Sequence, residues 1–348
     1  MKTTTPPTCR NDPLYSRARQ SVLFRRDAGI ANLQRALRIG YQHAIDLRDA
    51  MLGDILECHD GHWRIREGID MRHDPLLEDK LAQAAQWIRA ATSMVVAAGA
   101  GMGIDSGLPD FGGDNGFWRA DPALGRSRLH FEAIASPHAF EKHPATAWGF
   151  YGHRLNLYRA TTPHAGFGLL RGWSQRMPQG CFVFTSNVDG QFQKAGFPSA
   201  RVYECHGSIH RLQCTARCNE IIWPTADLHP QVDETTCQWQ AELPRCPHCG
   251  ALLRPNILMF DDWQWNHTRS QKQRMLLDRW LDSAQSPLVI EIGVGHAIAT
   301  VRDFSRRMQQ RGSRLIRINP DDARIHNPYG IEIALGAKDA LEAIASHL

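Results

Sequence analysis

The sequence predicts an α/β protein: a Rossmann-like parallel sheet with helices on both faces, a small cysteine-rich module and an N-terminal helical extension. Three observations predict this fold class. Short apolar runs bounded by turn residues alternate with helical stretches, which is typical of parallel strands joined by crossover helices. Cysteines occur in two closely spaced pairs in the second half of the chain, and arginine-rich helical patterns fill its first fifty residues.

The composition is that of a globular protein with a sizeable core, since 43% of the 348 residues are hydrophobic and 22% are charged. The formal net charge of +4 is far from the strong field of a dedicated nucleic-acid binder, so nucleic acid is not indicated as a partner. The opening residues hold no apolar core of a secretory signal, and no later run approaches the roughly 18 apolar residues of a membrane span. We therefore expect a cytoplasmic protein that does not enter a membrane.

The first 75 residues are expected to form a helical extension of a main domain that spans residues 76–348. Residues 12–52 read as helical, with apolar side chains at near-helical spacing between Ile30 and Ile39. Residues 1–50 carry nine Lys or Arg against four Asp or Glu. Two interpretations stay open for this basic segment: a solvated extension packed on the main domain, or a surface for a protein or nucleic-acid partner.

The start of the main domain follows from a break in the pattern. The stretch "GHWRIREG" is predicted as a short strand or turn, and Pro75 then interrupts any helix. An amphipathic helix over residues 76–92 leads into four apolar runs, which we predict as buried strands: "SMVVAAGAG", "CFVFTSN", "LVIEIGVG" and "SRLIRINP". Ligands of parallel sheets bind beyond the carboxyl ends of the strands. The residues that follow each run are therefore the candidate binding residues.

Three glycines follow the first run, in "AAGAGMGIDSGLPDFGG". Gly99, Gly101 and Gly103 lie at a predicted strand-to-helix turn. Missing side chains there allow the backbone to approach a pyrophosphate, with its amides facing the anion. The spacing is not the usual G-x-G-x-x-G, so by itself the motif fits a nucleotide site or a tight turn.

Polar side chains follow the second run, in "TSNVDG". Asn187 and Asp189 fall at the carboxyl end of a predicted buried strand and are expected to point toward the same crevice as the glycine turn. Burying an amide and a carboxylate is costly unless they bind something. The alternative is a local Asx turn that caps a helix.

A histidine occurs at another predicted strand end, in "ECHGSIH". His206 precedes Gly207, and imidazole is the side chain best matched to moving protons near pH 7. Taken alone, His206 fits a structural role as well as a catalytic base.

The cysteine pairs predict a zinc-binding module. Cys214 and Cys218 are separated by three residues, Cys246 and Cys249 by two, and two such knuckles close a tetrahedral site. Five of the nine cysteines lie in this region, which favours a metal site over disulfides. Cys237 and His248 are spare donors that could compete for a position. A closed shell of four thiolates would hold the fold rather than perform chemistry.

Taken in order, the glycine turn, Asn-x-Asp, His-Gly and the paired cysteines resemble the sirtuin family of NAD-dependent protein deacylases, over roughly residues 79–348. The resemblance implies catalysis by His206 with Asn187 and Asp189, and a zinc module at about 207–257 inserted in an NAD-binding domain. It assigns NAD contacts to Ala98, Gly99, Ala100, Gly101, Gly103, Asp110, Phe111, Ser186, Asn187, Asp189, Gly293, Val294, Gly295 and Asn319, and structural Zn²⁺ to Cys214, Cys218, Cys246 and Cys249.

The resemblance also implies a mechanism and a substrate, acylated lysine in a protein or peptide. The acyl-lysine oxygen attacks the anomeric carbon as nicotinamide leaves. His206 then takes a proton from a ribose hydroxyl, which attacks the imidate carbon, and water yields free lysine and O-acyl-ADP-ribose. Excluding bulk water protects the cationic sugar from simple hydrolysis.

The motif "FYGHR" holds the candidate residues for contact with the acyl group. Tyr151 and Arg154 are three apart on a predicted helix and so share a face. The pair resembles the Tyr-x-x-Arg of class III sirtuins, which receives an acidic acyl group such as succinyl, and arginine can hold a carboxylate through two parallel hydrogen bonds. Ordinary surface placement of the two residues is the alternative.

Several positions depart from the family pattern. Gly112 stands where an Arg is usual, Ser186 where a Gln is usual, and Gly103 where a Ser is usual; "FDD" at residues 260–262 replaces Phe-Gly-Glu, and "GVG" at residues 293–295 replaces Gly-Thr-Ser. An Asp in this substrate-binding strand is expected to alter peptide choice. The lost Arg and Gln keep a second hypothesis open, an NAD glycohydrolase or ADP-ribosyltransferase, and a third is a non-catalytic NAD-sensing or zinc-dependent interaction module.

Overall fold

The computed structural model describes residues 7–25, 27–66, 75–109, 130–295, 298–325 and 329–348. The chain divides into two compact units, one made of Met1–Ala90 with Leu315–Leu348, the other of Ala91–Arg314. The division differs from the boundary expected at residue 75, because the last strands and helix of the chain group with the N-terminal segment. Each unit is described by itself.

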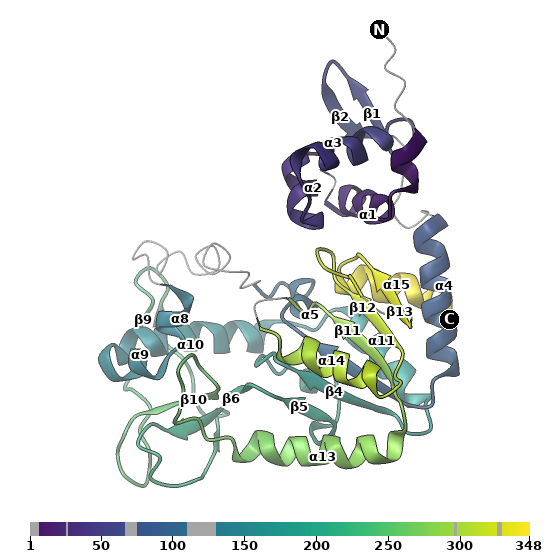
Figure 1. Cartoon of the computed structure of the whole chain (residues 1–348). Helices are drawn as coiled ribbons and strands as arrows, with labels where there is room; N and C mark the ends of the chain where they lie inside the picture. Colours follow the sequence, from purple (N-terminus) through teal and green to yellow (C-terminus); the bar gives the residue numbers. More distant parts are fainter. Residues whose placement is uncertain (1–6, 26, 67–74, 110–129, 296–297, 326–328) are drawn as a thin grey trace. The chain divides into compact units, whose positions relative to one another are not determined.

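The unit Ala91–Arg314 is built on four parallel strands: β3 (Met94–Ala98), β4 (Cys181–Thr185), β5 (Val202–Glu204) and β11 (Leu288–Ile292). Their order is β11-β3-β4-β5 (Figure 1). Every residue of β3, β4 and β11 is buried, as expected for strands covered on both faces. The register pairs Ile292 with Ala98, Ala98 with Thr185 and Thr185 with Glu204, so the four strands end at one level.

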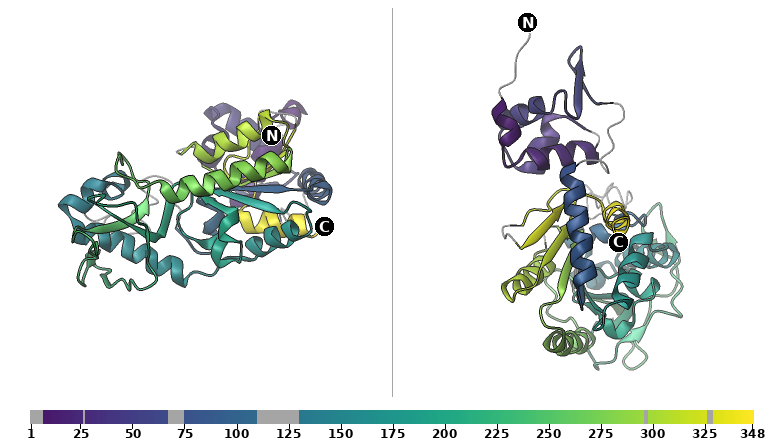
Figure 2. Two further views of the ribbon diagram at one scale, coloured as in Figure 1. Left: turned by 90° about the horizontal axis from the view of Figure 1, so that it is seen from below. Right: turned by 90° about the vertical axis from the view of Figure 1, so that its right-hand side faces the viewer.

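Helices cover both faces of this sheet (Figure 2). Phe182 and Phe184 share one face of β4 and contact Trp280 of α13 (Thr268–Ala284) and Phe304 of α14 (Thr300–Gln310). On the other face, α11 (Ala165–Gln175) packs against β4. A parallel sheet with helices on both faces (Figure 2) confirms the predicted fold class.

Further helices lie between these strands in the chain. They are α5 (Gly101–Ile104), α8 (Phe131–Ile134), α9 (Pro137–Lys142), α10 (Pro144–Ala160), α12 (Gln191–Lys194) and the 3-10 helix η3 (Ser199–Arg201). An antiparallel sheet of order β10-β6-β7 lies between β5 and α13 in the chain, with β6 (Gly207–Cys214), β7 (Trp223–Pro224) and β10 (Leu253–Ile257). The pair β8 (Val232–Asp233) and β9 (Gln238–Trp239) lies against α10.

The other unit begins with the 3-10 helix η1 (Pro7–Asn11), α1 (Tyr15–Arg25), α2 (Ile30–Leu37) and α3 (Tyr41–Ala50), then a hairpin of β1 (Leu56–His59) and β2 (His62–Ile65). It continues with α4 (Pro75–Ala90), the parallel strands β12 (Leu315–Ile318) and β13 (Gly330–Ile333), and α15 (Ala337–Ala345). The stretch 12–52 that reads as helical is therefore several helices, with Gly29 and Gly40 directly before α2 and α3. Within the described residues, no helix is long and apolar enough to cross a membrane.

Candidate functional site

The loops that follow β3, β4 and β11 are joined by backbone hydrogen bonds at the carboxyl edge of the sheet. The amide of Gly99 donates to Ile292 O at 3.0 Å, and the amide of Gly101 donates to Gly293 O at 3.0 Å. From β4, the amide of Ser186 donates to Ala98 O at 3.2 Å. Residues more than a hundred positions apart in the sequence thus form one continuous rim, at the edge where parallel sheets bind their ligands.

The glycines of this rim are needed for the contact between the two loops. A Cβ at Gly99 would lie 2.6 Å from Gly293 O, and one at Gly101 would lie 2.6 Å from Gly293 Cα. Gly293 itself has φ 62°, in the left-handed region that glycine adopts without strain. Close loop packing therefore accounts for Gly99, Gly101 and Gly293, whereas a Cβ at Gly295 would meet nothing within 4 Å.

The carboxamide of Asn187 turns toward the glycine loop. Its Nδ2 donates to Gly99 O at 3.0 Å, while its backbone amide donates to Thr185 Oγ1 at 3.0 Å. Thr185 Oγ1 in turn donates to Ala98 O at 2.9 Å. The structure thus brings Asn187 to the turn after β3, as parallel strands ending at one level require.

The carboxylate of Asp189 lies two residues further and has a different environment. It is buried, and its Oδ1 accepts a hydrogen bond from the amide of Gln191 at 2.8 Å, the geometry of an Asx turn at the start of α12. Burial raises the pKa of Asp189 to about 6. His210, which the sequence analysis did not single out, contacts Asp189 O through Nε2 at 2.8 Å. His210 lies on β6, four residues after His206. Its position in the sequence does not predict this contact.

His206 lies at the junction between the parallel sheet and the antiparallel module. The preceding amide, of Cys205, donates to Thr185 O at 2.9 Å, and His206 O accepts from the amide of Leu258 at 2.9 Å. Its side chain is partly buried, and burial lowers its pKa below the ordinary value. The imidazole is therefore neutral at pH 7, the protonation state that a general base requires.

Tyr151 and Arg154 are both buried on α10, so the alternative of ordinary surface placement is wrong. The Arg154 guanidinium carbon lies 3.5 Å from the centroid of the Phe150 ring, a cation–π contact. Burial raises the pKa of the Tyr151 hydroxyl, which keeps it protonated. Tyr151 belongs to the same apolar cluster as Ile209 of β6, against which Val188 packs. Tyr151 and the segment that follows β4 thus contribute to one apolar cluster.

The segment after β10 is anchored by a buried ion pair. Arg254 Nη2 lies 2.8 Å from Asp262 Oδ1, and the two side chains are 2% and 0% exposed. The Asp262 carboxylate is therefore engaged inside this segment. Asp261 beside it has φ 53°, a conformation that favours the glycine usual in the family and that Asp tolerates better than most residues.

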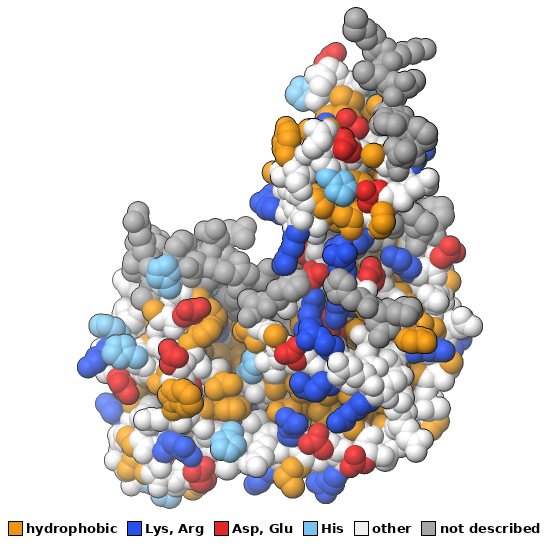
Figure 3. Space-filling view, in the orientation of Figure 1, with side chains coloured by type: hydrophobic (Ala, Val, Ile, Leu, Met, Phe, Trp, Pro, Cys, Tyr) orange, Lys and Arg blue, Asp and Glu red, His pale blue; other side chains and the backbone are white. Residues whose placement is uncertain are grey.

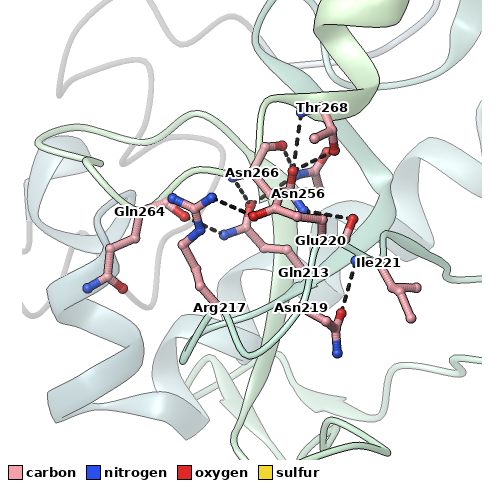
Figure 4. Close-up of polar contacts among 9 residues, drawn as sticks. All are labelled: Gln213, Arg217, Asn219, Glu220, Ile221, Asn256, Gln264, Asn266 and Thr268. Carbon is pink, nitrogen blue, oxygen red and sulfur yellow. Dashed lines mark hydrogen bonds and ion pairs between the residues drawn. The ribbon is translucent and has the colours of Figure 1, made fainter.

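A polar network holds the far end of the same segment, from Leu258 to His267 (Figure 4). Gln213 Oε1 accepts from Asn256 Nδ2 at 2.9 Å and from the amide of Asn266 at 3.0 Å. Asn256 Nδ2 also donates to Asn266 O at 2.8 Å, and Gln213 Nε2 donates to Gln264 O at 3.0 Å. The amide of Leu258 donates to His206 O. The network and the ion pair therefore fix the segment from Leu258 to His267 beside His206.

The four paired cysteines form one cluster with the geometry of a zinc site. Their Sγ atoms lie within 4.8 Å of one another, with Cys214 to Cys249 and Cys218 to Cys246 both 3.6 Å. A tetrahedron with Zn–S bonds of ~2.3 Å has S···S edges of ~3.8 Å, so the residues fit this metal. Cys237, a spare donor in the sequence analysis, lies in the β8–β9 hairpin and is outside the cluster.

The other residues that the resemblance assigns to NAD lie in several different environments. Val294 is buried and its carbonyl accepts from Arg302 at 2.7 Å, while Ala100 and Gly295 are exposed. Gly103 packs so closely on Leu108 that a Cβ would lie 2.9 Å from Leu108 Cδ1. Asn319 follows β12 in the other unit, where its Oδ1 accepts from the amides of Asp321 and Asp322 at 2.9 Å. Asp110, Phe111 and Gly112 lie outside the described residues.

Comparison with known proteins agrees with this geometry. A family model described as the Sir2 family matches residues 99–278. The chain is 25% identical over 256 residues to an NAD-dependent protein deacylase of Aquifex aeolicus, covering 74% of this chain and 95% of that protein. It is 26% identical over 274 residues to NAD-dependent protein deacylase 2 of Pseudomonas aeruginosa, covering 77% and 97%. A solved complex of a Sir2 homologue with NAD has a TM-score of 0.59 at 25% identity, covering 76% of this chain and 93% of that one.

Proposed function

Because this chain belongs to the Sir2 family, we propose that it is an NAD-dependent protein lysine deacylase. Its substrates are NAD and an acylated lysine in a protein or peptide, and its products are nicotinamide, the free lysine and O-acyl-ADP-ribose. The relatives named NAD-dependent protein deacylase are covered over nearly their whole length, which supports the assignment. The catalytic domain is residues 76–348.

The observation that carries the proposal is a neutral, partly buried imidazole, His206, beside a rim formed by the loops after β3, β4 and β11. In this assignment, NAD lies along the rim, with its pyrophosphate at Gly99 to Gly103 and its nicotinamide end at Asn187. Family resemblance assigns the adenosine half to Gly293 to Gly295 and to Asn319. Asp110, Phe111 and Ser186 line the nicotinamide ribose by family resemblance.

Each side chain then has a defined task. His206 accepts a proton from a ribose hydroxyl, and its lowered pKa leaves it ready to do so at pH 7. Asn187 orders the glycine turn through its hydrogen bond to Gly99 O and faces the nicotinamide end. Asp189 holds the loop that carries Asn187, because its carboxylate caps the start of α12. Cys214, Cys218, Cys246 and Cys249 hold zinc, which stabilises the module that carries His206 and β10.

We further propose that the acyl pocket accepts an acidic group such as succinyl. Arg154 is buried on α10 with its guanidinium over the Phe150 ring, and arginine can hold the carboxylate of an acidic acyl group through two parallel hydrogen bonds. Tyr151 stays protonated and can donate a hydrogen bond to the same group. The reduced thiols of the cysteine cluster suit a reducing compartment, and we place the enzyme in the cytoplasm.

A mass-resolved assay of NAD products tests the proposal. The protein is incubated with NAD and with acetyl-lysine, succinyl-lysine or unmodified peptides of one sequence. We expect nicotinamide and O-acyl-ADP-ribose to form only with an acylated peptide, and His206→Ala to abolish both while zinc content stays unchanged. Nicotinamide release at the same rate without any peptide would instead assign the chain as an NAD glycohydrolase or ADP-ribosyltransferase. An absence of turnover in well-folded, zinc-loaded protein would favour a non-catalytic module.

A further inference from the structure

The segment Pro7–Arg66 folds around an apolar core that the deacylase site does not use. Its helices α1, α2 and α3 contribute fully buried side chains, among them Val22, Leu33 and Leu47, and Met51 directly after α3 is also buried. Trp63 and Ile65 of the hairpin pack against the same core. The order of elements is three helices followed by a two-stranded hairpin (Figure 1).

The second and third helices form a helix-turn-helix. α2 ends at Leu37, Arg38 takes the left-handed conformation at φ 55° and ψ 48°, and α3 begins at Tyr41 directly after Gly40. Each helix buries one face, with Leu33 and Leu37 from α2 and Ala44, Leu47 and Ala50 from α3. A three-residue turn that contains glycine is the connection found in DNA-binding helix-turn-helix units, whose second helix enters the major groove.

The hairpin that follows is fixed against α3. Its tip contains Asp60 and Gly61, both with positive φ at 51° and 79°, which is the two-residue turn that suits a tight hairpin. The guanidinium carbon of Arg48 lies 4.1 Å from the centroid of the Trp63 ring, so the half-buried face of β2 is held against α3. The tip residues His59 to His62 are exposed. The hairpin is thus a projecting wing beside the second helix of the turn.

The excess of basic over acidic residues in this segment favours a polyanion. Residues 7–66 contain ten arginines, no lysine and seven acidic residues. Asp12 pairs with His43 at 2.8 Å, Asp54 with Arg19 at 2.9 Å, and Asp49 with Arg48 at 3.0 Å. Acidic and basic side chains are mixed at the surface in Figure 3, so the positive charge is not gathered in one continuous patch.

Three arginines of the segment are exposed. Arg35 near the end of α2 and Arg38 in the turn have no acidic partner in the part of the segment that the structure describes, whereas Arg64 on the wing lies directly across the hairpin from Glu57. Arginine is the side chain best suited to phosphate and to nucleic-acid bases. The three positions lie on the turn and the wing, which flank the second helix.

We propose that Pro7–Arg66 is a winged helix-turn-helix module that binds duplex DNA. α3 lies in the major groove, Arg35 and Arg38 contact phosphates next to it, and the wing contacts the adjoining backbone. Tyr41 and Gln42 in the first turn of α3 are exposed and meet base edges. Gln42 Nε2 bonds Asp46 Oδ1 at 2.9 Å, which orients the amide while leaving its oxygen and second N–H for an adenine. The chain would thereby bring its deacylase activity to proteins bound on DNA.

Fluorescence anisotropy with the full-length chain tests this, using a labelled pool of random 30-bp duplexes between 50 and 200 mM KCl. The test variant is Arg35→Gln with Arg38→Gln. The control variant is Arg274→Gln with Arg279→Gln, two exposed arginines on α13 that remove the same charge. Arg279 bonds a backbone carbonyl four residues earlier, as Arg35 does, which makes the helical sites comparable.

The wild-type chain is expected to bind with a Kd that rises steeply with salt. The test variant should bind at least 10-fold more weakly at 100 mM KCl, with a log–log salt slope smaller by about 2, because each lost phosphate contact removes about one unit. The control should match the wild type, and both variants should keep wild-type deacylation of a peptide. No binding by the wild type at 50 mM KCl, or equal weakening in the two variants, would overturn the proposal.

Sequence selection from the same pool tests the placement of α3. The wild type should enrich a short motif that contains adenine, and Gln42→Ala should lose preference at one position while keeping the salt slope of the wild type. Enrichment of the same motif by Gln42→Ala and wild type would contradict the assignment of α3 to the major groove. Preference for single-stranded DNA over the duplex would contradict the module itself.

Discussion

Replacing Asp262 by Asn should strongly destabilise the unit Ala91–Arg314, because it removes the negative charge opposite a buried guanidinium. Arg254 Nη2 lies 2.8 Å from Asp262 Oδ1 and the two side chains are 2% and 0% exposed. Asn has the size of Asp and keeps an oxygen that can accept from the amide of Gln264, so the change is close to a loss of charge alone. Leaving one partner of such a pair unpaired costs about 3–5 kcal/mol.

The expected loss can be measured as a shift of melting temperature. A unit of about 150–250 residues loses roughly 2–4 °C per kcal/mol, so Asp262→Asn should lower the Tm by about 6–20 °C in differential scanning calorimetry. The control is Asp303→Asn, which breaks an exposed pair with Arg306 whose side chains are 41% and 63% exposed. Such a pair contributes about 0–1 kcal/mol, so the Tm should move by only a few degrees.

A double variant tests whether the loss of stability comes from the unpaired charge of Arg254. Arg254→Met with Asp262→Leu replaces the pair by apolar side chains of similar size, and substitutions of this kind in buried pairs are often neutral or stabilising. The double variant should therefore be more stable than Asp262→Asn. A Tm for Asp262→Asn within 2 °C of the wild type, or a double variant less stable than the single one, would refute the reasoning about the unpaired charge.

The other predictions concern the metal, two titrating groups and the acyl pocket. Cys246→Ser should lower the zinc content from one ion per chain and the Tm with it, by atomic emission and calorimetry; full stability without zinc would contradict a structural site. Because burial raises the pKa of Asp189 to about 6, above its unfolded value near 3.9, the carboxyl contributes less stability as pH rises from about 4 to 7. Urea titrations should find that Asp189→Asn gains up to ~3 kcal/mol on the wild type across that range, and an unchanged difference would exclude the raised pKa. The neutral form of His206 is the active one, so kcat/KM should rise with pH with a midpoint below the ordinary histidine pKa, whereas a midpoint above pH 7 would contradict its burial. Arg154→Met should reduce turnover of succinyl-lysine at least 10-fold more than that of acetyl-lysine, and equal losses would remove the acidic pocket.

The sequence predicts the elements whose signal is local. Buried parallel strands appear as continuous apolar runs, and a cysteine cluster appears as paired spacings, so the sheet and the zinc module follow from the pattern. The meeting of Asn187 with the glycine turn also follows, because strands ending at one level bring their next residues together.

Contacts that depend on tertiary packing leave no such signal. Arg254 and Asp262 are eight residues apart, and nothing in the spacing tells that the chain returns to bury both. The glycines of the first loop fit a phosphate turn, yet a Cβ at Gly99 or Gly101 would strike the Gly293 backbone, a reason that only the packed loops reveal. The N-terminal stretch reads as helical throughout, since Gly29 and Gly40 interrupt its period without erasing it.

The most direct test of the central claim is calorimetric titration of NAD into the wild-type chain and into Asn187→Ala, whose carboxamide bonds Gly99 O at the rim. The account predicts one NAD per wild-type chain and an affinity at least 10-fold weaker for the variant, while both proteins keep their zinc. An absence of heat with the wild type, or equal affinities in the two proteins, would contradict a dinucleotide site on this rim.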